Sequence, residues 1–282
     1  MREFRQVDVF SDAALRGNPV AVVHGAEGLD DEQLAAFARW TNLSETTFLL
    51  TPTAQGAAGG ADYRLRIFTP GGELPFAGHP TLGSAHAWLE AGGSPAAPGV
   101  VVQECGAGLV AVRHEAGSPL AFRAPPLLRS GAPTADELAA ALRALRVGPD
   151  AVLETAWIDN GPGWLGVLLA DPGAVLALEP DWSAFGELKI GVAGIQPDPG
   201  PDGPHVEVRA FCPQYGVPED PVTGSLNAGL GLWLGGRRLP RRYMAAQGTV
   251  LQRAGRVHVS VEDADVWVGG ATRTTIRGTL AL

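Results

Sequence analysis

His79-Pro-Thr-Leu-Gly-Ser84 and Asp220-Pro-Val-Thr-Gly-Ser225 are two versions of one motif, and they start 141 residues apart in a chain of 282. The pattern Arg-x-Phe-x-Pro also occurs twice, at residues 66–70 and 209–213, which start 143 residues apart. Nearly equal offsets, kept in the same order, indicate that the chain is two copies of one half-domain. A long period that occurs only twice predicts two similar lobes, because a solenoid needs shorter repeats in larger number.

The composition is that of a soluble globular protein. Hydrophobic residues make up 45% of the chain and charged residues 18%, and the length suits two domains that each bury a core. The formal net charge of −9 argues against nucleic acid or an anionic membrane as a partner, since both attract clustered basic charge. No run approaches the ~20 apolar residues of a membrane span, and the first residues lack the apolar core of a signal peptide. We therefore expect a cytoplasmic protein.

Helix and strand signals alternate in both halves. We predict a helix from Asp30, as its cap, to Trp40, and a second from Pro80 to Leu89, since proline suits the first turn of a helix. Further helices are predicted at 134–145, where Thr134 begins a capping box, at 181–188 and at 221–234. The predicted strands are 4–10, 20–23, 46–50, 63–68, 100–103, 109–112, 152–158, 165–169, 189–192 and 206–211.

Two of the predicted helices decide the fold class. Residues 85–89 and 226–234 are apolar on nearly every side, so each helix should be enclosed by sheet. We therefore expect an α+β fold of two pseudo-symmetric lobes, each a mostly antiparallel, barrel-like sheet wrapped around a central helix. The expected lobes are residues 1–120, completed by 271–282, and residues 121–270.

The repeated motif supplies the candidate site. Each copy lies at a predicted helix N-terminus, whose free N–H groups and partial positive charge suit a carboxylate. If the two ends faced each other, a small anionic molecule would be held between His79 and Asp220, which could move a proton at a neighbouring carbon. Each residue also has a structural interpretation: Asp220 and His79 as helix caps or buried hydrogen-bonded groups, Glu45 as a surface residue, and Ser225 as a partner of helix N–H groups.

Other cofactor and metal signals are weak. Lys189 is the only lysine and lies in a strand-like run, so neither a pyridoxal phosphate enzyme nor a P-loop is expected. The glycine patterns at 161–166 and 106–111 lead into strands and lack the helix that a dinucleotide fingerprint requires. Cys105 and Cys212 have no metal spacing, and their separation breaks the repeat offset, which places a cysteine-based racemase last among the hypotheses.

Four stretches together resemble the PhzF family of phenazine-biosynthesis isomerases. They are Asn42-Leu-Ser-Glu-Thr46, Arg66-Ile-Phe-Thr-Pro70, Glu73-Leu-Pro-Phe-Ala-Gly-His-Pro80 and Gly216-Val-Pro-Glu-Asp-Pro-Val-Thr-Gly-Ser225. The resemblance spans essentially the whole chain. It implies the diaminopimelate-epimerase fold, no cofactor or metal, and a homodimer.

The same resemblance implies an activity and roles for residues. Glu45 would shuttle a proton between carbons of a small carboxylate substrate, as in the isomerisation of trans-2,3-dihydro-3-hydroxyanthranilate. The other implied site residues are His79 and Asp220, which hold and polarise the substrate, and Ser44, Gly78, Gly224 and Ser225, which bind it. Two alternatives stay open: a related isomerase or epimerase with another substrate, and a dimer that binds a metabolite without chemistry.

Overall fold

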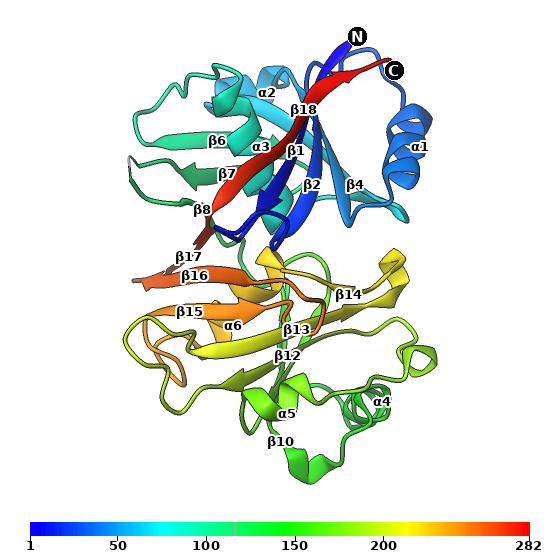
Figure 1. Cartoon of the computed structure of the whole chain (residues 1–282), viewed down its shortest axis with the longest axis vertical. Helices are drawn as coiled ribbons and strands as arrows, with labels where there is room; N and C mark the ends of the chain where they lie inside the picture. The colour runs from blue at the N-terminus through cyan, green and yellow to red at the C-terminus, as the bar shows by residue number, and fades with distance from the viewer. Residues whose placement is uncertain (116) are drawn as a thin grey trace. The chain divides into compact units, whose positions relative to one another are not determined.

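The computed structural model describes residues 1–115 and 117–282, apart from the side chain of Tyr215. The chain forms two compact units, which we call unit 1 (Met1–Arg123 with Gly269–Leu282) and unit 2 (Ala124–Val268). Both termini belong to unit 1, where strand β18 (Thr272–Leu280) runs antiparallel beside β1 (Arg2–Val9) (Figure 1). The last strand of the chain is therefore paired with the first.

Unit 1 is a mixed sheet in which two connections run through helices. Its other strands are β2 (Asn18–Val23), β3 (Glu45–Leu50), β4 (Tyr63–Thr69), β5 (Gly72–Leu74), β6 (Val100–Cys105), β7 (Gly108–Arg113) and β8 (Leu120–Arg123), and a short helix α2 (Ala54–Ala58) follows β3. The β2–β3 and β4–β6 pairs are parallel, whereas the remaining pairs of the unit are antiparallel. Helix α1 (Asp31–Thr41) joins the first parallel pair and α3 (Gly78–Glu90) the second, as parallel strands require a long crossover.

Unit 2 has the same order of pairings. Its helices and strands are β9 (Arg129–Gly131), α4 (Ala135–Leu145), β10 (Val152–Asp159), β11 (Trp164–Leu169), α5 (Pro172–Leu176), β12 (Lys189–Ile195), β13 (Val206–Cys212), β14 (Val217–Asp220), α6 (Gly224–Leu234), β15 (Arg242–Gln247) and β16 (Gly255–Glu262); β17 (Asp265–Gly270) leads on to β18. The β11–β12 and β13–β15 pairs are parallel, and α6 joins the second of them as α3 does in unit 1.

The α+β class is confirmed, but the barrel-like closure is not. Among the described residues β18 pairs only with β1, so the run of strands in unit 1 keeps a free edge. Most side chains of β18 are exposed, which fits an edge strand rather than a strand inside a closed barrel. The sheet is therefore open.

The two apolar helices are enclosed as expected. Helix α3 contacts β1, β2, β3, β6, β7, β8 and β18, and α6 contacts β10, β11 and β16 (Figure 1). All of the first eight residues of α3 and of α6 are buried. Their N-terminal turns are therefore shielded from bulk water.

Three helix boundaries differ from the sequence prediction. Helix α3 begins at Gly78, two residues early, and α6 begins at Gly224 rather than Pro221 because Asp220 ends strand β14 against β13. The predicted helix at 181–188 is only a 3₁₀ turn over Trp182–Ala184. Gly186 follows with a φ of +52°, a left-handed conformation that interrupts a helix.

The repeated Arg-x-Phe-x-Pro pattern marks the same local structure in both units. Arg66 of β4 forms an ion pair with Glu73 of β5, and its guanidinium lies 5.0 Å from the ring of Phe68. Arg209 of β13 pairs with Glu219 of β14 and lies 4.9 Å from Phe211. The second pair is almost fully buried and the first partly exposed, so the shared motif tolerates different degrees of desolvation.

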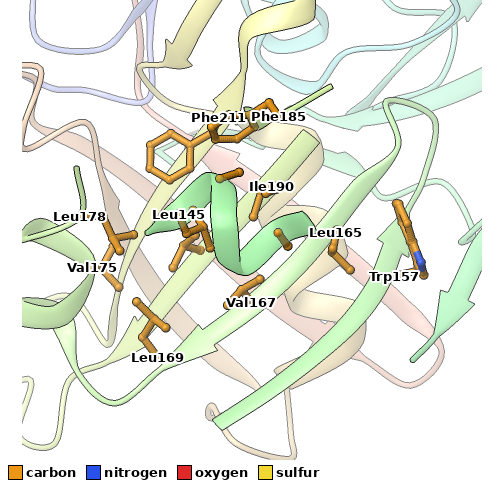
Figure 2. Packing of buried hydrophobic residues seen from close by; sticks show 13 residues of the cluster. Leu145, Trp157, Leu165, Val167, Leu169, Val175, Leu178, Phe185, Ile190 and Phe211 are labelled. Carbon is orange, nitrogen blue, oxygen red and sulfur yellow. The ribbon is translucent and has the colours of Figure 1, made fainter. Parts of the chain in front are cut away.

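One hydrophobic core cluster of unit 2 lies between α4 and the sheet. Figure 2 shows Leu165, Val167 and Leu169 of β11 near Leu145, the last residue of α4. These three positions alternate along the strand and therefore share one face. Phe185 and Phe211 extend the same cluster, with ring centroids 6.1 Å apart.

Replacing Gly83 by Ala is expected to destabilise the protein. A Cβ at this position of α3 would lie 2.3 Å from Cγ1 of Val20 and 3.1 Å from Cγ2 of Val9, so the helix would be pushed off β1 and β2. Alanine is normally the better helix former, yet overpacking should outweigh that gain and lower the free energy of unfolding by about 1–2 kcal/mol. Urea unfolding measures the change, with Gly278→Ala as the control because no atom lies within 4 Å of that Cβ. Equal stability of the two variants would contradict the close packing of α3.

Candidate active site

A carboxyl group and an imidazole meet at the N-terminal end of α3. Glu45 is the first residue of β3, and His79 is the second residue of α3. His79 Nε2 lies 3.3 Å from Glu45 Oε2, and the side chains are 3% and 13% exposed. The structure thus brings together two of the three predicted catalytic residues, which are 34 positions apart in sequence.

The surroundings of His79 keep its ring neutral. Burial lowers the pKa of His79 from 6.5 to about 3, outweighing the carbonyl of Pro19, which acts in the opposite direction. The side-chain amide nitrogen of Asn18 lies 3.3 Å from Nδ1 of His79. A neutral imidazole carries a single ring proton, so His79 brings no positive charge to the side of the ring that faces Glu45. Glu45 Oε2 therefore lies beside an uncharged ring nitrogen.

The strands fix the start of α3 through buried polar contacts. The hydroxyl groups of Thr47 on β3 and Ser84 on α3 lie 2.9 Å apart, and Gln103 Nε2 donates to the Thr81 hydroxyl at 3.0 Å. These bonds tie the first two turns of the helix to the sheet. The position of His79 relative to Glu45 is therefore set by the core of unit 1.

In unit 2, Asp220 is held by a network of buried side chains. Asp220 is 7% exposed, and its Oδ2 accepts a 2.6 Å hydrogen bond from the hydroxyl of Thr223. Gln247 Nε2 donates to that hydroxyl at 2.9 Å and to the Asp220 carbonyl at 3.1 Å. The N-cap residue of α6 is Thr223. The alternative interpretation of Asp220 as the helix cap is therefore wrong.

Ser225, the second residue of α6, is held by the turn that joins β10 to β11. Trp164 Nε1 donates to its hydroxyl at 3.0 Å, and Asn160 Nδ2 donates to its carbonyl at 2.8 Å. Gly224 precedes it and is buried. The unit 2 candidates, Asp220, Gly224 and Ser225, therefore all lie within the strand end and first turn that lead into one helix.

Both helix starts lack a capping side chain. The N-cap residues of α3 and α6 are Ala77 and Thr223. Neither side chain accepts a hydrogen bond from a backbone N–H group of the first turn. By contrast, α1 and α4 each have a complete capping box. Uncapped N–H groups at a buried helix start favour an anion. Gly78 is the first residue of α3 and lies at such a start. The last candidate, Ser44, is half-buried just before Glu45, and its hydroxyl makes no hydrogen bond to the described residues.

The sequence prediction missed the residues that hold the candidates in place. Asn18, Gln247, Trp164 and Asn160 contact His79, Asp220 or Ser225 directly. None of these four residues was identified from the sequence as part of the site. The predicted clamp between His79 of unit 1 and Asp220 of unit 2 stays a prediction.

Within residues 1–115 and 117–282, no group of three or more His, Cys, Asp or Glu residues is placed to hold a metal ion. None of the helices in that part of the chain is long and apolar enough to cross a membrane.

Comparisons with known proteins match the chain over nearly its whole length. The profile of the PhzC-PhzF family, described as phenazine biosynthesis-like protein, matches residues 7–282. The chain is 37% identical to antisense-enhancing sequence 1 of Schizosaccharomyces pombe, covering 98% of this chain and 97% of that protein. It is 34% identical to trans-2,3-dihydro-3-hydroxyanthranilate isomerase of Pseudomonas aeruginosa, covering 94% and 92%. A solved PhzF-family structure from Enterococcus faecalis is similar over the full length of both chains, with 27% identity and a TM-score of 0.79.

Replacing His79 by Gln is expected to reduce the loss of stability in acid. The folded protein keeps His79 neutral down to a pH of about 3, whereas the unfolded chain binds a proton near pH 6.5. Stability therefore falls as the pH drops below about 6.5, by up to about 1.4 kcal/mol per pH unit for one proton. Urea unfolding of wild type and His79→Gln between pH 7 and 4 measures the slope, and the exposed His114→Gln controls for loss of a histidine. Identical slopes for wild type and His79→Gln would show that His79 is protonated in the folded state.

Proposed function

The chain belongs to the PhzC-PhzF family of phenazine biosynthesis-like proteins, and on this basis we propose that it is an isomerase that moves a proton on a small carboxylate substrate. The observation that carries the proposal is the buried contact between Glu45 and His79. A carboxyl group beside a neutral imidazole can take up a proton and release it again, since an uncharged neighbour does not fix it in the ionised form. Glu45 is therefore the proposed proton shuttle, and His79 the group that orients it and contacts the substrate.

The helix starts support the binding part of the proposal. The first turns of α3 and α6 are buried and lack capping side chains, so the backbone of Gly78 and Gly224 can serve a carboxylate. Ser225 adds a hydroxyl at the start of α6, and Ser44 adds a second one beside Glu45. We propose that Asp220, held by Thr223 and Gln247, binds a polar group of the same substrate.

The proposed test substrate is trans-2,3-dihydro-3-hydroxyanthranilate. It is the compound named for the isomerase of Pseudomonas aeruginosa, which is similar to this chain over more than nine-tenths of both sequences. The compound carries a carboxylate and an amino group on a ring, which match the anion-binding helix starts and the carboxyl of Asp220. Its isomerisation moves a proton between carbons without any net oxidation, so the side chains described above suffice for the chemistry.

Replacing Glu45 by Gln is expected to abolish turnover while leaving the fold intact. Removal of a positioned acid–base group lowers the rate by roughly 10²–10⁴-fold. Incubation with trans-2,3-dihydro-3-hydroxyanthranilate in D₂O, followed by NMR, measures both consumption and deuterium uptake at carbon. Glu32→Gln on α1 is the matched control, because Glu32 is exposed and forms a surface ion pair with Arg39.

Each result of this experiment has a distinct meaning. Consumption by wild type and by Glu32→Gln, but not by Glu45→Gln, would support the proposal. Full activity of Glu45→Gln would refute the proton shuttle. Binding of the compound by wild type without any exchange of carbon-bound protons would indicate a metabolite-binding protein instead.

We also propose that the enzyme works as a homodimer without a metal or cofactor. Dialysis of the purified protein against a chelator is then expected to leave its turnover number unchanged, and sedimentation equilibrium should give twice the mass of 29.2 kDa. Activity that is lost on dialysis and restored by a metal ion would contradict the first part, and a monomeric mass the second.

A further inference from the structure

The turn between β10 and β11 is locked by its own side chain and glycines. Asp159 Oδ1 accepts hydrogen bonds from the N–H groups of Gly161 and Gly163, both at 2.7 Å. The two glycines have φ values of 141° and 88°, which other residues rarely adopt. This is the glycine pattern that resembled a nucleotide fingerprint in the sequence. In the structure it builds a rigid turn.

The rigid turn places two side chains against the first turn of α6. Asn160 donates to the carbonyl of Ser225 at 2.8 Å, and the indole of Trp164 donates to the Ser225 hydroxyl at 3.0 Å. Trp164 is 2% exposed, Asn160 3% and Ser225 4%. One residue thus fixes the backbone of Ser225 while the other fixes its side chain.

The chemistry of the indole determines what the Ser225 hydroxyl can do. An indole N–H only donates, so the hydroxyl oxygen must accept and its own proton is left to point elsewhere. Within the part of the chain that the structure describes, the Ser225 hydroxyl donates no hydrogen bond. We propose that Trp164 is a positioning residue, which holds the Ser225 hydroxyl as a donor toward the substrate carboxylate. This inference rests on the proposed role of Ser225 in substrate binding.

Asn160 presents a buried amide to the start of α6. The amide oxygen of Asn160 is buried and has no hydrogen-bond partner among the residues that the structure describes. A buried polar atom without a partner destabilises a fold, and in native structures it commonly marks a functional site. In this position the amide nitrogen of Asn160 donates to the Ser225 carbonyl. Core packing alone would not require an amide at that position.

A purely structural role for Trp164 makes different predictions. A buried indole contributes to stability through its area whatever its N–H contacts. If that were its only role, Trp164→Phe would lower the melting temperature and leave the kinetic constants of the folded enzyme unchanged. A positioning role requires a change in KM that depends on Ser225.

The test compares wild type, Trp164→Phe, Ser225→Ala and the double variant, with trans-2,3-dihydro-3-hydroxyanthranilate as the substrate. Loss of a hydrogen bond to a charged group should raise KM about 10-fold or more in Ser225→Ala, and Trp164→Phe should raise it by about 5- to 10-fold, with a smaller effect on kcat in both. The double variant should match Ser225→Ala within about 2-fold, because residues that act through one another are not additive.

Trp157→Phe is the matched control. Trp157 is also buried in unit 2, and its indole N–H donates to Glu137 Oε2 at 3.1 Å, away from α6. The same ring change and the same loss of an N–H should lower stability there while KM and kcat stay within about 2-fold of wild type. An increase in KM equal to that of Trp164→Phe would show that the effect is not specific to Ser225.

A measurement without substrate separates this inference from the proposed function. In ¹H–¹⁵N NMR spectra of the full chain, the indole signal that disappears in Trp164→Phe should shift in Ser225→Ala, whereas the Trp157 signal should stay in place. Three results would each overturn the inference and leave the isomerase proposal standing. They are an unchanged chemical shift of the Trp164 indole in Ser225→Ala, additive effects of the two substitutions on KM, and an unchanged KM in Trp164→Phe. If the wild type is inert toward the compound, the proposed substrate fails, and the NMR shift alone decides whether Trp164 holds Ser225.

Discussion

Two helices that are apolar on nearly every side have to be kept from water, and the arrangement of each unit follows from this requirement. In unit 1, strands from both ends of the chain contact α3, which is why β18 pairs with β1 although 270 positions separate Arg2 from Thr272. Burial of the whole helix includes its first turn, where backbone N–H groups have no partner within the helix. The hydrophobic effect thus places polar backbone groups in a dry environment, where a charged ligand is bound more strongly than at the surface.

Strand direction places the acid–base residues beside that first turn. Strands β2 and β3 are parallel, with Val20 opposite Glu45, so Asn18 and Glu45 lie at the starting edge of the same two strands. Helix α3 brings His79 to this edge. The same packing buries both side chains, so a neutral histidine and a carboxyl group lie in contact away from water. The chemistry proposed for the site depends on that desolvation.

The two units use one scheme for different chemistry. Each has a buried strand glutamine, Gln103 or Gln247, that donates to a threonine hydroxyl at a helix start. In unit 1 the neighbouring functional group is an imidazole, whereas in unit 2 it is the carboxyl of Asp220. The shared framework fixes the backbone, and the residue at one position decides whether an imidazole or a carboxyl group lies at the helix start.

The sequence by itself determined the features that depend on local pattern. The offset repeats, the apolar helices and the capping box at Thr134 led to the α+β class and to most helix and strand positions, because hydrophobic periodicity and caps are properties of neighbouring residues. The repeated motif and the family resemblance pointed to His79, Asp220 and Ser225, while Glu45 was indistinguishable from a surface residue until that resemblance was drawn. The helix starts, the open sheet and the failed helix at 181–188 were decided by strand pairing and a glycine φ, which no local pattern encodes. Only the tertiary structure could show Glu45 beside His79 or Trp164 on Ser225, since these contacts join residues 34 and 61 positions apart through the packing of a buried core.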